Sequence, residues 1–241
     1  MFKKITAIFT ICLLSAMCVS ENALADRRSY VWTYEYQTMP KGMVEAEFYL
    51  TEEQKKIDKA KPNIWKPWVE LEYGITDRWD VSMYQQLKQS NTDSSSKFEY
   101  DGFKVRTRYR ISERGKLPVD ILLYLEYIRP GDFKKANVLE EKLIFAKDIG
   151  NFNIAYNQIF KQELESDGKA EYEYASGISY EITPAFKIGI ESKGNYTDRK
   201  YYIGPTISLA SSRVWIAAGV VTGLNERSDD LQARCIVGIL F

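Results

Sequence analysis

Apolar residues at every second position, in segments of about ten residues, constrain the fold of this chain more than any other feature. The same alternation recurs at 69–75, 103–111, 152–156 and 172–182. It is clearest in the last segment, whose apolar positions are Leu231, Ala233, Cys235, Val237, Ile239 and Phe241. A period of two places successive side chains on opposite faces of a strand. The pattern therefore predicts an all-β chain in which each strand has one apolar and one polar face.

The connections between these segments alternate in length. Short ones, such as 74–78 and 147–151, are followed by longer polar ones, such as 52–63 and 161–169. Short periplasmic turns and long outer loops are typical of outer-membrane barrels. We predict an antiparallel up-and-down transmembrane β-barrel of about 12 strands. The expected strands are 42–51, 64–75, 79–88, 98–111, 119–129, 138–147, 151–161, 171–182, 185–193, 200–210, 213–223 and 231–241.

The N-terminal region divides into two parts. Lys3 and Lys4 precede an uncharged stretch at 5–17, and Ala23-Leu24-Ala25 offers small residues for cleavage. We therefore predict that residues 1–25 are a cleaved signal peptide. The predicted barrel occupies residues 42–241. Because bacterial barrels of this kind have an even number of strands, we assign no barrel strand to residues 26–41. We expect this N-terminal segment at the periplasmic mouth, or folded into the lumen.

Composition excludes several classes of function. The chain has 33 basic and 33 acidic residues and no histidine. Balanced charge argues against a nucleic-acid partner, and the missing histidine excludes Ser-His and Cys-His hydrolases and imidazole-ligated metal sites. The acidic residues of the outer connections match no calcium loop. We therefore expect no enzyme activity, no catalytic residues, no metal site and no cofactor.

The end of the sequence and two turn-centred pieces resemble known families. Phe241, with alternating apolar residues behind it, resembles the assembly signal of Gram-negative outer-membrane β-barrel proteins, although Ile236 stands where that signal has glycine. The pieces 39–42 and 71–79 are similar to the outer-membrane transporter family of phenol-degradation pathways. These resemblances imply a Gram-negative outer-membrane location, contact with its lipid, recognition of Phe241 by the barrel assembly machinery, and passage of a small solute.

Two charged sets fall on the inward faces of the predicted strands. The basic set is Lys104, Arg106, Arg108 and Arg110, and the acidic set is Glu45, Glu47, Glu70 and Glu72. They can line an aqueous pore and bias it modestly towards anions. Alternatively, they can neutralise each other in a network that partly fills the lumen. If the strands pair through a turn at 112–118, Arg110 lies near Asp120, Lys104 near Glu126, and Arg106 faces Tyr124.

Three functions remain open on sequence grounds. The first is passive passage, or pathway-linked uptake, of small polar or charged solutes. The second is a plugged structural or adhesion-type barrel that acts through its outer loops. The third is a soluble secreted β-barrel that binds one ligand. Twelve strands lie between barrels filled by side chains and open channels, so the strand count does not decide between an open and a plugged lumen.

Overall fold

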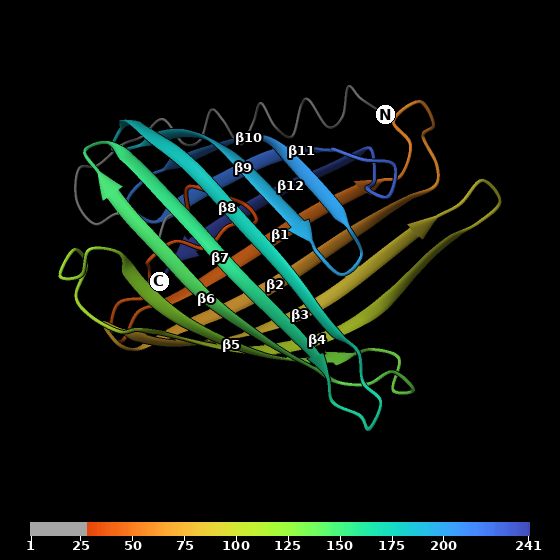
Figure 1. Ribbon diagram of the computed structural model, residues 1–241, viewed down its shortest axis with the longest axis horizontal. Coiled ribbons are helices and arrows are strands. Elements are labelled where there is room, and N and C mark those ends of the chain that lie inside the picture. The colour runs from red at the N-terminus through yellow and green to blue at the C-terminus, as the bar shows by residue number, and fades with distance from the viewer. Residues whose placement is uncertain (1–27) are drawn as a thin grey trace.

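The computed structural model describes residues 28–241, and the predicted signal peptide lies outside this range. It confirms the twelve-stranded antiparallel barrel (Figure 1). The strands are β1 (Val44–Gln54), β2 (Asn63–Thr76), β3 (Trp79–Asn91), β4 (Ser96–Arg110), β5 (Asp120–Pro130), β6 (Val138–Ile149), β7 (Phe152–Glu163), β8 (Ala170–Thr183), β9 (Phe186–Asn195), β10 (Lys200–Ala210), β11 (Val214–Gly223) and β12 (Leu231–Leu240).

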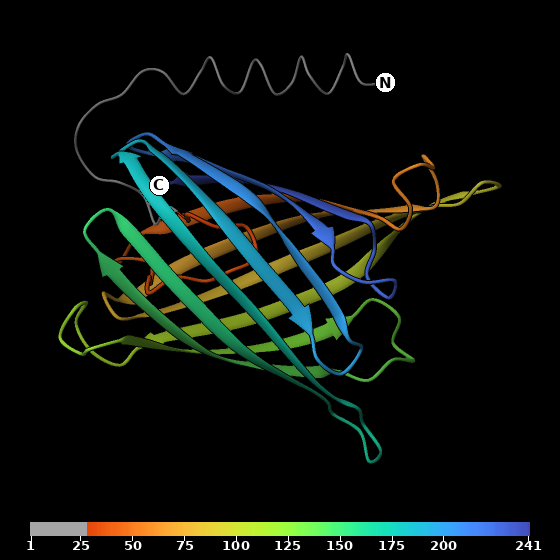
Figure 2. The same cartoon turned by 45° about the horizontal axis from the view of Figure 1, so that its top comes forward.

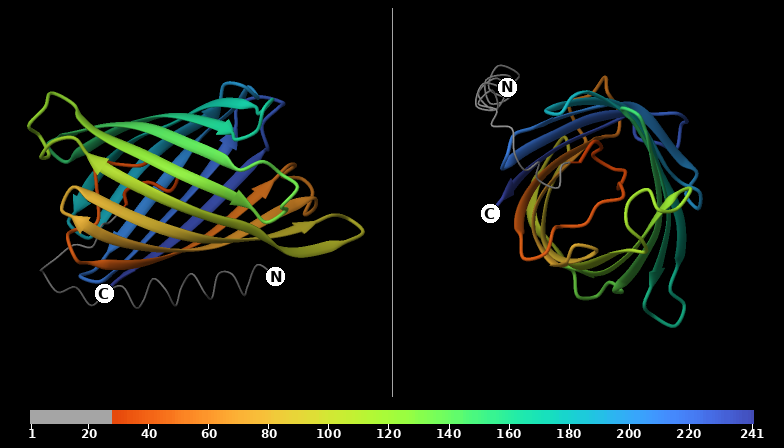
Figure 3. Two further views of the ribbon diagram at one scale, coloured as in Figure 1. Left: turned by 90° about the horizontal axis from the view of Figure 1, so that it is seen from below. Right: turned by 90° about the vertical axis from the view of Figure 1, so that its left-hand side faces the viewer.

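Each strand pairs antiparallel with its neighbours in sequence, and β1 pairs with β12 to close the barrel. Closure satisfies the backbone hydrogen bonds of every strand and leaves no free sheet edge. Figure 3 shows the resulting ring viewed from one end. Within residues 28–241 the structure has no helix that is both long and apolar enough to cross a membrane.

The exterior of the barrel is apolar and the interior is polar. Leu71, Val105 and Ile190 are 54%, 46% and 58% exposed on the outside, whereas Glu72 and Arg106, their neighbours in sequence, are buried inside. A water-soluble protein has the opposite distribution, so this exterior argues against the soluble ligand binder. The fold and its apolar surface fit the outer membrane of a Gram-negative bacterium.

Apart from the long β4–β5 connection at 111–119, the connections are short at one end of the barrel and longer at the other, as predicted. The turns that join β2 to β3 and β6 to β7 leave two residues outside the strands, whereas the β1–β2 loop spans residues 55–62. Figure 2 shows the longer loops projecting beyond the strands at one end. Ile57 N–H and Lys56 Nζ donate to the Asp230 carboxylate at 3.1 and 3.2 Å, and both bonds lower its pKa. This contact ties two outer loops together across the β1–β12 junction.

Residues 28–39, which we call the lumen segment, lie inside the barrel without forming a helix or strand. All of them are buried except Gln37. The segment is the orange-red stretch within the ring in Figure 3. The sequence left two locations open for this part of the chain, the periplasmic mouth and the lumen. The structure places it in the lumen. The reason is its apolar and aromatic content, since Tyr30, Val31, Tyr36 and Met39 have no exposed surface.

Candidate functional site

Two side chains near mid-height of the barrel fix the lumen segment through its backbone. The Glu191 carboxylate of β9 accepts hydrogen bonds from the N–H groups of Val31, Trp32 and Thr33 at 2.6, 2.8 and 3.0 Å. Asn157 of β7 accepts from Tyr34 N–H at 2.6 Å and donates to the Tyr34 carbonyl at 2.9 Å. An irregular buried backbone needs such partners because it lacks those of a helix or sheet.

The lumen segment also reaches strands on other sides of the barrel. Arg28 donates to the Tyr49 hydroxyl of β1 at 3.0 Å, and Tyr30 donates to the Asn153 carbonyl of β7 at 2.8 Å. Met39 N–H donates to Asp80 of β3 at 3.0 Å. The segment is thus bonded to widely separated parts of the wall and lies across the lumen.

Apolar packing secures the same segment against β10–β12. Val31, Trp32 and Met39 belong to one buried cluster with Trp215 and Ile236. The approach is close: a Cβ atom placed on Gly219 lies 2.6 Å from Val31 Cγ2. Only glycine therefore leaves room for the segment at that point of β11.

Two residues of the predicted basic set and two of the acidic set form a single buried network with Asp80. Arg106 Nη2 lies 2.9 Å from Glu70 Oε1 and also bonds Glu72. Arg108 bonds Glu72 and, at 2.7 Å, Asp80. The structure therefore places these side chains as each other's partners, with Arg106 only 1% exposed.

The remaining predicted residues surround this network. Lys104 Nζ contacts Glu126 at 2.9 Å, and Arg110 donates to the Thr38 hydroxyl at 2.9 Å. Glu45 accepts from the Trp215 indole at 3.1 Å. Glu47 bonds the Tyr49 hydroxyl and lies 3.9 Å from Arg28. Both glutamates are buried.

The register between β4 and β5 differs from the expected one by two residues. Arg106 pairs in register with Glu126, Arg108 with Tyr124 and Arg110 with Leu122. The expected Arg110–Asp120 pairing and the expected Arg106–Tyr124 register are therefore wrong, because the connection extends over 111–119 and pairs Ile111 N–H with the Ile121 carbonyl. Lys104 still reaches Glu126, because its side chain crosses to the residue diagonally opposite.

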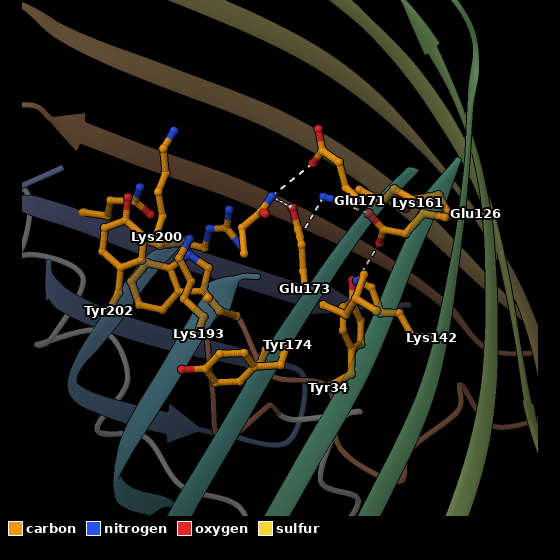
Figure 4. Close-up of a pocket in the computed structure, with 18 of the residues that line it drawn as sticks. Tyr34, Glu126, Lys142, Lys161, Glu171, Glu173, Tyr174, Lys193, Lys200 and Tyr202 are labelled. Carbon is orange, nitrogen blue, oxygen red and sulfur yellow. Dashed lines mark hydrogen bonds and ion pairs between the residues drawn. The ribbon is translucent and has the colours of Figure 1, made fainter. Parts of the chain in front are cut away.

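A cavity of about 410 Å³ lies on the outer-loop side of the lumen segment. Basic, acidic and aromatic side chains dominate its lining, and Arg28, Trp32 and Tyr34 contribute from the segment itself (Figure 4). Lys104 is the one member of the predicted sets in this lining. A second cavity, of about 230 Å³, lies near the short turns and is lined by Glu35, Arg114 and Lys187 among others.

One side of the larger cavity is a network of ion pairs. Lys142 contacts Glu140 at 2.8 Å, and Lys161 bridges Glu140 at 3.4 Å and Glu173 at 2.8 Å. Dashed lines in Figure 4 mark such contacts. Lys104, Lys142 and Lys161 each have a carboxylate partner on this side, so the positive charges of this wall are compensated.

The other side carries cations over aromatic rings. Lys193 Nζ lies 5.1 Å from the Trp32 ring centroid and 5.3 Å from that of Tyr202. Arg234 Cζ lies 5.5 Å from the Trp32 ring and 5.7 Å from the Trp68 ring. Sequence reasoning did not single out Lys193, Arg234 or Glu191, although the inward positions of β9, every second residue from Lys187 to Lys193, were open to the same analysis as those of β4.

Solved structures of outer-membrane porins have a similar fold. The NanC porin is 10% identical over 82% of this chain and 98% of its own, with a TM-score of 0.54. The KdgM porin, solved alone and in complex with disordered oligogalacturonate, is 14% and 13% identical over the same shares, with a TM-score of 0.55 in both cases. No protein-family model matches the sequence, and no curated protein sequence is significantly similar to it. Identities this low show a shared fold alone.

Proposed function

We propose that this protein is a non-catalytic outer-membrane barrel that admits small polar or charged solutes from the outer side and passes them to the periplasm. The larger cavity carries this proposal. About 410 Å³ bounded by charged and aromatic side chains suits a small hydrated solute. The partners it implies are outer-membrane lipid on the apolar exterior and a small solute inside, with no nucleic acid.

The lumen segment is the element that controls passage in this proposal. It separates the outer cavity from the smaller one near the short turns. A solute that crosses the barrel must pass beside the segment or displace it. The fold shared with porins supports a transport role, and one of those porins is described with an oligogalacturonate ligand.

An engineered crosslink between the segment and the wall tests this function. Val31→Cys and Gly219→Cys, in a Cys235→Ser background, place two thiols where Val31 Cγ2 and a Gly219 Cβ are 2.6 Å apart. In a disulfide the sulfur of one cysteine lies about 3 Å from the Cβ of the other, so a contact too short for two unbonded side chains approaches the spacing of a covalent bridge. We expect ion conductance in planar bilayers from the native barrel and from the reduced variant, in which the unbonded thiols crowd the segment away from β11, and a lower conductance from the oxidised variant.

The two other outcomes are equally informative. Conductance that is unchanged by oxidation means that solutes pass beside a fixed segment. Absence of conductance from the native and reduced proteins overturns the proposal. It would favour the plugged barrel that acts through its outer loops, an alternative supported by the complete burial of Val31, Thr33 and Tyr36 in the lumen.

We also propose that Phe241 serves as the assembly signal for the barrel assembly machinery. Its side chain is 72% exposed at the rim, and its N–H donates to the Val44 carbonyl at 2.9 Å. A terminal ring that projects from the closing strand is available to a receptor before insertion. Deletion of Phe241 should lower the yield of heat-modifiable folded barrel in the outer membrane, whereas an unchanged yield would contradict this role.

A further inference from the structure

We propose that Lys193 and Arg234 form a binding site for small carboxylate solutes on the β9–β12 side of the larger cavity. The inference rests on the proposed function and specifies the class of solute. Both residues line the cavity, together with Trp32 and Trp68. Figure 4 shows Lys193 beside Tyr202, on the opposite side from the ion-pair network of Lys142 and Lys161.

Strand register places no acidic residue directly opposite either cation. Lys193 stands opposite Tyr202 of β10 and Ala175 of β8. Arg234 stands opposite Gly219 of β11 and Thr51 of β1. Cross-strand partners are the usual source of compensation within a barrel. None of these four positions carries an acidic residue.

The carboxylates that act on Lys193 from farther away are engaged elsewhere. Glu53 contacts Lys66 at 2.6 Å, and Glu173 contacts Lys161 at 2.8 Å. Among residues 28–241, no carboxylate forms an ion pair with Lys193 or with Arg234. Neither cation therefore has an ion-pair partner in the described chain, in contrast to the lysines on the other side of the cavity.

The hydrogen-bonding capacity of both cations is only partly used. Arg234 donates through Nε to the Thr51 hydroxyl at 2.9 Å and through Nη1 to the Val31 carbonyl at 3.0 Å. Within the described chain, neither its Nη2 atom nor the Lys193 ammonium has a hydrogen-bond acceptor. Donors on two adjacent cations can bind one carboxylate, and charge-assisted bonds of this kind are strong in a site partly shielded from water.

The aromatic rings define the rest of the site. Trp32, Trp68 and Tyr202 flank the cations, so a bound solute would meet flat apolar faces next to its charged end. Rings of this kind bind the carbon-bearing face of a hydroxylated ring while leaving its polar edge for hydrogen bonds. A small carboxylate with such a face fits better than a bare inorganic anion.

Equilibrium titration of the full mature barrel in detergent tests the proposal. The probes are galacturonate and galactose, which share a ring and differ in a carboxylate. We expect heat of binding from galacturonate and none from galactose. Lys193→Gln should weaken galacturonate binding about tenfold, and Lys193→Arg should restore most of it.

A matched control removes a lysine from the inner wall outside the cavity lining. Lys88, on β3, contacts Asp101 at 2.9 Å and Glu99 at 3.1 Å, so Lys88→Gln removes the same charge from a compensated position. We expect its galacturonate affinity to equal that of the native barrel. Each variant is first checked for heat-modifiable mobility, and Lys193→Met serves in place of Lys193→Gln if the latter does not fold.

The results separate this proposal from the one it rests on. Equal binding of galactose and galacturonate, equal loss in Lys88→Gln and Lys193→Gln, or unchanged affinity in Lys193→Gln would each overturn the carboxylate site. Uptake of the two sugars into proteoliposomes is measured in parallel. Uptake of both sugars without a preference for the carboxylate would be consistent with solute passage but not with the carboxylate site. Binding of galacturonate without uptake would support the carboxylate site and overturn the proposal of solute passage.

Discussion

The two sides of the barrel interior use charge in opposite ways. On β2–β4, Arg106 is buried between Glu70 and Glu72, and Arg108 pairs with Glu72 and Asp80. On β9–β12, Lys193 and Arg234 stand over aromatic rings with no carboxylate partner in the described chain. The strand with closely spaced cations in the sequence, β4, therefore lies on the side of the lumen where the charges pair with each other. The two isolated cations, Lys193 and Arg234, lie on the side without carboxylate partners.

Register explains this difference. Glu72 of β2 stands opposite Ser82 of β3, which in turn stands opposite Arg106 of β4. A small serine between them lets the long arginine side chain reach the glutamate two strands away. Around Lys193 the directly opposite positions hold Tyr202 and Ala175, and the diagonally placed Glu173 contacts Lys161 instead.

Removal of a compensated charge should have the largest effect on stability. Arg106→Gln would leave buried Glu70 without its cation and Glu72 with Arg108 alone. Breaking one partner out of a buried pair costs about 3–5 kcal/mol. We expect a decrease of that size in the free energy of unfolding, measured by urea titration of the barrel in lipid vesicles. A decrease below about 1 kcal/mol would show that the network is not what stabilises this side.

The anchor of the lumen segment should have an intermediate effect. Glu191→Gln keeps the side-chain shape but loses the charge that accepts three backbone N–H groups. Hydrogen bonds to a charged group contribute about 1.5–3 kcal/mol, so we expect a loss of about 2 kcal/mol. Amide exchange of Val31, Trp32 and Thr33 should accelerate by a matching factor.

A control for this anchor is Glu181→Gln. Glu181 lies near the short turns, where its carboxylate is 3.5 Å from Lys187. The same change there should leave exchange at Val31–Thr33 as it is in the native protein. Equal acceleration in both variants would mean that the Glu191 contact does not specifically hold the segment.

Removal of an uncompensated charge should have a small effect on stability. Lys193→Met keeps the length and apolar body of the side chain and leaves no carboxylate unpaired. We expect the free energy of unfolding to stay within about 1 kcal/mol of the native value, or to rise. A loss of unfolding free energy as large as that of Arg106→Gln would contradict the proposed difference in charge pairing between the two sides of the barrel interior.

Ion selectivity should change by the smallest amount, and only on one side. Lys193→Gln should shift the reversal potential under a salt gradient towards cations, because it removes positive charge that faces the cavity. Lys193→Arg keeps that positive charge and should leave the reversal potential unchanged. The shift should also fade with salt, since the screening length falls from about 10 Å at 0.1 M to about 3 Å at 1 M. An equal shift in both variants would contradict the assignment of the field to β9–β12.

The strands were predictable because a lipid-facing barrel imposes a strict period of two. Val105 and Arg106 illustrate this, since alternation alone assigned the first to the exterior and the second to the interior, as the structure shows. Ion-pair partners were not predictable. They depend on register, which the β4–β5 connection sets through its 111–119 loop, and on diagonal reach such as that of Lys104 to Glu126.

The lumen segment and the cavity were harder to predict for a different reason. Residues 28–39 have no periodicity, because their partners come from many strands rather than from one sheet face. Nothing in the local sequence of Val31 indicates Glu191 or Arg234. Lys193 lies in an expected strand but was not assigned to a face from the sequence, and only the register shows that no acidic residue stands directly opposite it.

The position of the lumen segment has a consequence for the order of folding. Val31 bonds residues 160 and 203 positions away, on β9 and β12. Contacts of such sequence separation form late, since the intervening chain must be ordered first. The residues near the beginning of the mature chain therefore reach their native contacts only after the last strand is in place. Protection of Val31 in a refolding time course would report that the barrel is complete.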